Sequence, residues 1–215
     1  MNQKTKITVI AWDLHGVLFV KSIWHWFYLI VTFPGLFKAL WKMSFCGYVL
    51  ILKYILRKIG IYKKEITNEE LINLCENDGN DQMIALIKKV SCDYVPNTSM
   101  IALVKKIHDL GIQQDIVSNI GETVFTQFKQ MYPDVFIYFK NFFTVTVQPG
   151  KATLKKPDPF YFQAYLDKYT YASHEILFID DNSDNVESAK KVGIFALNFS
   201  SVSLLKKDLD NLNIF

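Results

Sequence analysis

The sequence predicts an α/β protein, in which a doubly wound, Rossmann-like parallel sheet forms the core and an α-helical cap is inserted into it. From residue 95 onward, short apolar, β-rich runs alternate with segments of helical periodicity, and residues 18–94 interrupt this alternation with a composition of their own. Strands that alternate with helices form parallel sheets with both faces covered. We therefore expect residues 1–17 and 95–215 to form the core and residues 18–94 to form the helical cap.

The expected elements have recognisable starts and ends. Residues 7–12 form the first strand, and a capping box at Thr67 and Glu70 opens the helices of residues 65–94. An amphipathic helix begins after Pro96 and ends at Gly111. The later core elements are a strand at 116–117, a helix at 122–131, a strand at 142–147, a helix at 158–169 with Asp158 at its start, a strand at 176–179, a helix at 183–192 and a strand at 194–197.

The expected cap is basic and aromatic. Residues 21–64 contain seven Lys, Arg57 and no Asp or Glu, whereas the whole chain has a net charge of only +3. The longest charge-free run, residues 22–37, contains Pro34 and Gly35 and is shorter than the ~20 apolar residues needed to cross a bilayer. Helices of a compact cap are the favoured interpretation, and an amphipathic contact with a membrane surface is the alternative.

Composition excludes several other classes of protein. Arg57 is the only arginine, which disfavours sequence-specific nucleic-acid binding. Cys46, Cys75 and Cys92 have neither metal-binding nor redox spacing, which indicates reduced thiols and a cytoplasmic protein. The short N-terminal apolar run is interrupted by Asp13 and is not typical of a signal peptide.

Polar residues follow the apolar runs of the predicted sheet. They are Asp13, Ser118 with Asn119, Lys156, and Asp180 with Asp181. The carboxyl ends of parallel strands meet at one edge, so these groups are expected to converge there. A carboxylate can attack phosphorus, and a Mg²⁺ ion held by further carboxylates would neutralise a phosphate dianion. The lysine and the serine hydroxyl would bind the phosphoryl oxygens. This pattern predicts hydrolysis of a small phosphorylated metabolite.

Four motifs, in order across residues 7–197, resemble those of the haloacid dehalogenase-like (HAD) hydrolase superfamily. They are Asp13-Leu14-His15-Gly16-Val17-Leu18, then Val117-Ser118-Asn119, then Lys156-Pro157-Asp158-Pro159, and finally Phe178-Ile179-Asp180-Asp181-Asn182 with Asn185-Val186 and Gly193. The third motif has the form typical of members with a helical cap after the first motif.

The resemblance implies a role for each of these polar residues. It implies that Asp13 is the nucleophile and a metal ligand, and that the backbone carbonyl of His15 is another ligand. Ser118 and Lys156 would bind phosphate, with Asn119 beside them. Asp180 would bind Mg²⁺ with the help of Asp181, and Asp184 is a weaker candidate.

One position departs from the family pattern. Phosphatases of this superfamily usually carry an acid/base Asp two residues after the nucleophile, where this chain has His15. An unperturbed histidine titrates near pH ~6.5, so His15 can either substitute for that Asp or mark an impaired enzyme.

Three functions therefore compete. The first is a Mg²⁺-dependent phosphatase with an aspartyl-phosphate on Asp13. The second is a 2-haloacid dehalogenase, which Asp180 and Asp181 argue against. The third is a catalytically weak binding or membrane-peripheral protein, suggested by His15 and the basic cap.

Overall fold

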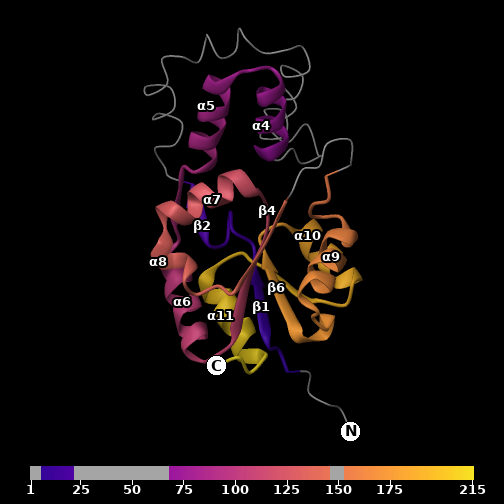
Figure 1. The fold of residues 1–215 in the computed structure, drawn as a ribbon. Helices are drawn as coiled ribbons and strands as arrows, with labels where there is room; N and C mark the ends of the chain where they lie inside the picture. The colour runs from indigo at the N-terminus through magenta and orange to yellow at the C-terminus, as the bar shows by residue number, and fades with distance from the viewer. Residues whose placement is uncertain (1–5, 22–67, 146–152) are drawn as a thin grey trace.

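The computed structural model describes residues 6–21, 68–145 and 153–215 (Figure 1). Five strands form a sheet in the order β5-β4-β1-β6-β7, and each neighbouring pair is parallel. The strands are β1 (Val9–Trp12), β4 (Gln113–Gly121), β5 (Asn141–Val145), β6 (Ile176–Asp180) and β7 (Phe195–Asn198). This architecture confirms the predicted α/β fold class.

Helices cover both faces of the sheet. Helices α6 (Thr98–Asp109) and α11 (Val202–Asn211) lie on one side, and α9 (Pro159–Tyr169) and α10 (Ser183–Lys191) lie on the other (Figure 1). Alternate side chains of β1 enter the two cores, Ile10 and Trp12 on the first side and Val9 and Ala11 on the second. Burial on both faces explains why β1 and β6 appear in the sequence as continuous apolar runs.

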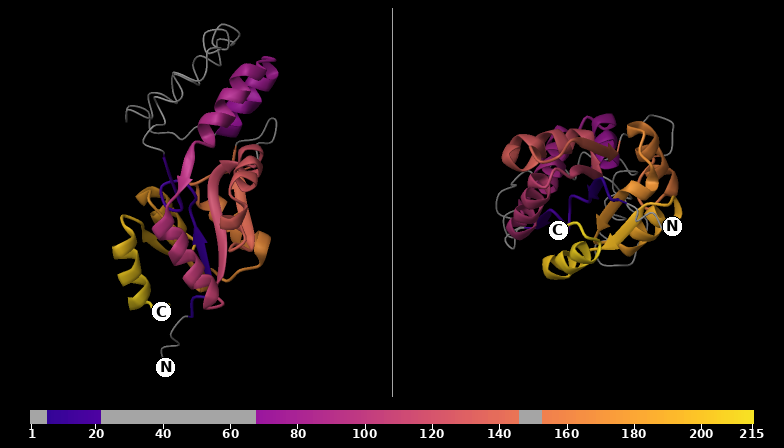
Figure 2. Two further views of the ribbon diagram at one scale, coloured as in Figure 1. Left: turned by 90° about the vertical axis from the view of Figure 1, so that its left-hand side faces the viewer. Right: turned by 90° about the horizontal axis from the view of Figure 1, so that it is seen from below.

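A helical insertion projects from the sheet (Figure 2). Helices α4 (Asn68–Asn77) and α5 (Asp81–Ser91) pack against each other beyond the end of β1 (Figure 1). A two-stranded antiparallel ribbon, β2 (Phe19–Lys21) and β3 (Tyr94–Pro96), lies at the predicted junctions near residues 18 and 95. Helix α4 also contacts β4 and α7 (Glu122–Met131).

Part of the predicted cap lies outside the described residues. The basic aromatic stretch, and with it the membrane-contact hypothesis, falls almost entirely within residues 22–67. Among the residues that are described, no helix combines the length and apolar character needed to cross a membrane.

Strand β4 is longer than the predicted strand of residues 116–117, because it also includes the polar residues on both sides of that apolar pair. Gln114 is only 1% exposed, and its side chain accepts a hydrogen bond from Trp12 Nε1 (3.1 Å) and donates one to the Val104 carbonyl (3.0 Å). Satisfied in this way, a polar side chain is compatible with a central strand. Residues Ser118–Asn119, predicted to follow the strand, therefore lie within it, and the register with β5 shifts between Val117 and Gly121.

Several other elements were not predicted from the sequence. They are β2, β3, the short helix α8 (Pro133–Phe136), a 3₁₀ turn at Ser173–Glu175, and α11. Helix α11 begins at the N-cap Ser201 and buries Leu205 and Leu209, which are four residues apart, against the core.

The predicted position of Asp158 at the start of a helix is confirmed, since it is the N-cap of α9 and accepts a hydrogen bond from Phe160 N (2.9 Å).

Candidate active site

A buried lysine joins two aspartates at the carboxyl ends of neighbouring strands. Asp13 directly follows β1 and Asp180 ends β6, which pairs with β1. Lys156 Nζ donates to Asp13 Oδ1 (2.8 Å), Asp180 Oδ2 (2.7 Å) and the Val117 carbonyl (3.0 Å). Lys156 is 1% exposed and Asp180 is fully buried. The convergence expected at this edge of the sheet is therefore observed for three of the predicted residues.

Burial and charge set the protonation of this cluster. Burial raises the pKa of Asp13 to about 7; the nearby Lys156 opposes the shift, and the negative Asp180 and Asp181 add to it. Burial alone would lower the pKa of Lys156, but Asp13 and Asp180 outweigh it and raise that pKa. The ammonium therefore stays charged at neutral pH, and the proton on Asp13 is the one that changes there.

Three carboxylates in this cluster are placed to hold a metal ion. One oxygen atom from each of Asp13, Asp180 and Asp181 lies within 4.8 Å of the other two, the one such grouping in the described residues. Carboxylate oxygens are the ligands that Mg²⁺ prefers, so the donor set fits this ion. Asp184 is exposed and lies outside the grouping.

The Asp180 carboxylate is oriented by its own neighbours. Asn182 N donates to Oδ1 (2.8 Å) and Asn185 Nδ2 donates to Oδ2 (3.0 Å). Such hydrogen bonds hold a ligand carboxylate in one orientation. From the sequence, Asn185 was recognised only as part of the fourth motif. Its position in the first turn of α10, soon after β6, is the feature from which its contact with Asp180 could have been predicted.

A glycine lets Asp181 approach the loop after β1. Gly16 has φ +92°, in the left-handed region, and a Cβ atom built there would lie 2.2 Å from Asp181 Oδ2. Any larger residue would therefore strain the backbone and displace this carboxylate. The positive φ and the close approach of Asp181 thus explain why the first motif has a glycine at position 16.

Ser118 and Asn119 have different surroundings. Ser118 is 2% exposed, and its backbone carbonyl accepts a hydrogen bond from Tyr161 Oη (2.8 Å). The Asn119 side chain binds the backbone of Lys156 twice, donating to its carbonyl (2.9 Å) and accepting from its N–H (2.8 Å). Asn119 therefore fixes the loop that carries Lys156, and direct contact of either residue with substrate stays a prediction.

His15, two residues after Asp13, packs its ring against aromatic side chains. Its ring packs against Tyr94 (centroids 4.2 Å apart) and lies edge-on to Phe128 (5.7 Å), and its Nε2 atom is buried. The ring is not part of the metal-competent grouping. This contact with Tyr94 could not be predicted from the sequence, because it joins β3 to the loop after β1 across about 80 residues of chain.

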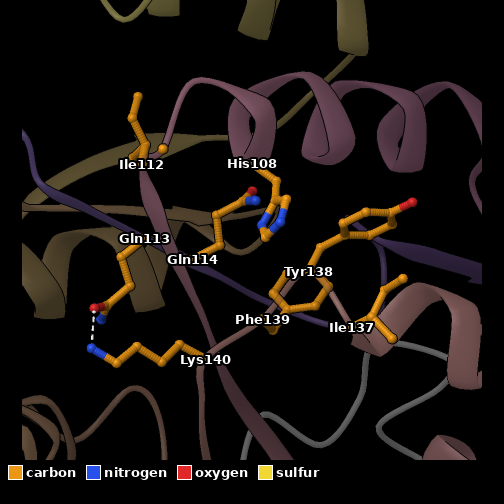
Figure 3. A pocket seen from close by; sticks show the side chains of 9 residues that line it. His108, Ile112, Gln113, Gln114, Ile137, Tyr138, Phe139 and Lys140 are labelled. Atoms are coloured by element: carbon orange, nitrogen blue, oxygen red, sulfur yellow. Dashed lines mark hydrogen bonds between the residues drawn. The ribbon is translucent and has the colours of Figure 1, made fainter.

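A pocket lies where β4 begins, at the end of this strand opposite to Ser118 and Asn119 (Figure 3). This pocket of about 260 Å³ is lined by the end of α6, the turn into β4 with its first residues, and the segment before β5, including His108, Tyr138 and Lys140. Lys140 Nζ donates to Gln113 Oε1 (2.8 Å). The pocket is formed where β4 begins, whereas ligands of open α/β sheets bind where strands end. The carboxylate cluster is therefore the candidate active site.

The chain combines a five-stranded parallel α/β fold with a carboxylate cluster that could hold a metal ion. A family model for haloacid dehalogenase-like hydrolases matches residues 33–199, more than three-quarters of the chain. The protein therefore belongs to the haloacid dehalogenase-like hydrolases. The matched region includes Ser118, Lys156 and Asp180 and begins after Asp13.

Solved structures show the same fold. A HAD family enzyme from Bacteroides thetaiotaomicron is 20% identical, with a TM-score of 0.59 over 94% of this chain and 98% of the other. The same enzyme in complex with magnesium and inorganic phosphate is 18% identical, with a TM-score of 0.56 over 93% and 98%. The L-2-haloacid dehalogenase from Xanthobacter autotrophicus is 16% identical, with a TM-score of 0.58 over 95% and 83%. No curated protein sequence matches this chain.

Proposed function

We propose that the protein is a Mg²⁺-dependent phosphatase that hydrolyses a small phosphorylated metabolite through an aspartyl-phosphate on Asp13. The observation that carries this proposal is the buried Lys156 ammonium bonded to both Asp13 and Asp180, with Asp181 completing three carboxylates. A cation beside a carboxylate nucleophile is what attack on a phosphate dianion requires, because the two anions otherwise repel.

The chain's own residues account for both steps. A carboxylate oxygen of Asp13 forms a bond to phosphorus while the ester P–O bond breaks, and the leaving oxygen takes a proton. Water then attacks phosphorus, the acyl-phosphate bond breaks, and inorganic phosphate and the Asp13 carboxylate are released. Lys156 and Ser118 bind the phosphoryl oxygens in both steps. A Mg²⁺ ion held by Asp13, Asp180 and Asp181 would supply further positive charge against the phosphoryl group.

Dehalogenation is the second candidate, because the L-2-haloacid dehalogenase shares the fold. That reaction forms an ester between the nucleophile and carbon and needs no metal-binding carboxylates. Asp180 is fully buried, and a buried carboxylate is costly unless cations compensate it. Asp13, Asp180 and Asp181 together offer three carboxylate oxygens within 4.8 Å of one another, a donor set that suits a divalent cation. A reaction without a metal ion does not need this set, which favours the phosphatase.

Phosphate release from an aryl phosphate tests the proposal. After treatment with a chelator, the wild type is expected to be inactive, and addition of Mg²⁺ restores turnover. Asp180→Asn should raise the Mg²⁺ concentration needed for half-maximal activity by at least about 10-fold, since it removes one charged ligand. The exposed Asp184→Asn serves as the control and should match the wild type. Metal-independent halide release from a 2-haloacid, without phosphate release, would contradict the proposal.

The proton for the leaving group is assigned to His15 in this proposal. This residue lies two positions after Asp13, and its ring is held by contacts with Tyr94 and Phe128. His15→Ala should lower kcat for an alkyl phosphate by about 10²-fold or more, the usual range of general acid catalysis. The loss should be much smaller for a nitrophenyl phosphate, whose leaving group departs without a proton. Equal losses for both substrates would remove His15 from this role.

A further inference from the structure

We propose that Glu70 of the helical insertion is a positioning residue, which holds Lys156 in place through its neighbour Lys155. The inference rests on the proposed function of Lys156. Glu70 lies in the first turn of α4, 85 residues before Lys155, so its contact with the core is a long-range one.

The ion pair between Glu70 and Lys155 is bidentate and sheltered. Lys155 Nζ donates to both carboxylate oxygens of Glu70, at 2.8 and 3.1 Å. The Lys155 side chain is 11% exposed and the Glu70 side chain is 27% exposed. The pair formed by Lys190 and Glu187 has the same 2.8 Å separation, but its side chains are 49% and 65% exposed. Shelter from water strengthens the first pair, whereas exposed pairs contribute little.

The ion pair acts on the segment that carries the catalytic lysine. Lys155 reaches the insertion, whereas Lys156, the next residue, reaches the carboxylate cluster in the core. Asn119 fixes the backbone of Lys156 between them. These contacts hold the two lysines at three points: the carboxylate cluster, Asn119 and Glu70. Of these three, Glu70 belongs to the insertion and the other two belong to the core. Small displacements of a group that binds the reacting atoms are costly to rate.

A second contact keeps the insertion docked without Glu70. The adjacent Glu69 accepts a hydrogen bond from Thr123 Oγ1 (2.9 Å) at the start of α7. Its side chain also lies against Gly121, where a Cβ atom would come within 2.1 Å of Glu69 Oε2. Burial raises the pKa of Glu69, as expected for a side chain enclosed between two elements. Substituting Glu70 should therefore disturb the lysine segment more than the attachment of α4.

The test uses the full-length protein and the aryl phosphate assay with Mg²⁺. Glu70→Gln and Lys155→Glu should each lower kcat by about 10-fold and raise KM, because a displaced Lys156 both misaligns the phosphoryl group and binds it less tightly. The charge-reversed double variant, Glu70→Lys with Lys155→Glu, should recover most of kcat. Glu187→Gln, which breaks the exposed pair, is the matched control and should leave kcat and melting temperature unchanged.

Calorimetric titration with inorganic phosphate in the presence of Mg²⁺ gives a readout that is independent of turnover. Glu70→Gln should weaken this binding by about 10-fold, since the Lys156 contact is misplaced. An active wild type whose kcat and phosphate affinity are unchanged by Glu70→Gln, or a double variant without recovery, overturns the inference alone. A wild type that neither hydrolyses aryl phosphate nor binds inorganic phosphate overturns the proposed function, and the inference with it.

Discussion

Asp13→Asn is expected to abolish phosphate ester hydrolysis, lowering kcat by about 10⁴-fold or more, as loss of a covalent nucleophile does in other hydrolases. An amide cannot form the acyl-phosphate, and it also removes one of the three candidate metal ligands. The measurement is steady-state hydrolysis of an aryl phosphate in saturating Mg²⁺, with Asp184→Asn as the control. Retention of more than about one per cent of wild-type kcat would exclude Asp13 as the nucleophile.

The same substitution has a pH-dependent effect on the stability of the metal-free protein. The folded pKa of Asp13, about 7, lies above the unfolded value of 3.8, so the folded state binds the extra proton between these pH values. Wild-type stability therefore falls as pH rises from about 4 to 7 through this group and levels off above, whereas the variant lacks this dependence. The melting temperature of the variant relative to the wild type should rise over the same interval. A constant difference would contradict the raised pKa.

Lys156→Met is expected to destabilise the metal-free protein by about 3–5 kcal/mol, because it leaves two buried carboxylates without their cation. For a chain of this size, that loss corresponds to a fall in melting temperature of roughly 6–20 °C. Millimolar Mg²⁺ should recover part of the loss, since a bound divalent cation neutralises the same carboxylates. Activity should fall by at least about 10²-fold, the cost of removing one charge-stabilising donor.

Lys190→Met is the control for this substitution. Lys190 belongs to an exposed ion pair, so its loss should change stability by no more than about 0.5 kcal/mol. If Lys156→Met melts at the wild-type temperature, the buried cluster does not have the energetics assigned to it. If Mg²⁺ stabilises the wild type but gives the variant no recovery, the metal does not bind at these carboxylates.

The local features of the site could be predicted from the sequence. Asp13 and Asp180 follow apolar runs that are buried on both faces, and strand ends of a parallel sheet meet at one edge. The pairing partners could not be predicted, because they depend on contacts between distant segments. The contact between Glu70 and Lys155 joins residues 85 positions apart, and the ring contact of His15 with Tyr94 joins the loop after β1 to β3.

The length of β4 illustrates a second limit. Asp115 is fully buried within this strand although aspartate is a polar residue. Its carboxylate accepts hydrogen bonds from Tyr165 Oη (2.9 Å) and Tyr171 Oη (2.8 Å), both of which come from α9 and the turn after it. Polarity predicts a loop only where no such donors exist. These donors come from a segment at least 50 residues later in the chain, so the local sequence pattern predicted too short a strand.

The central claim is a covalent phosphoryl group on Asp13, and rapid quenching followed by peptide mass spectrometry tests it most directly. Wild-type protein mixed with an excess of aryl phosphate and Mg²⁺, then quenched in acid within one turnover, should carry a phosphoryl group on the peptide that contains Asp13. The group should be absent without Mg²⁺ and in Asp13→Asn. Rapid Mg²⁺-dependent hydrolysis with no phosphorylated peptide, or with the phosphoryl group on another residue, would contradict the account.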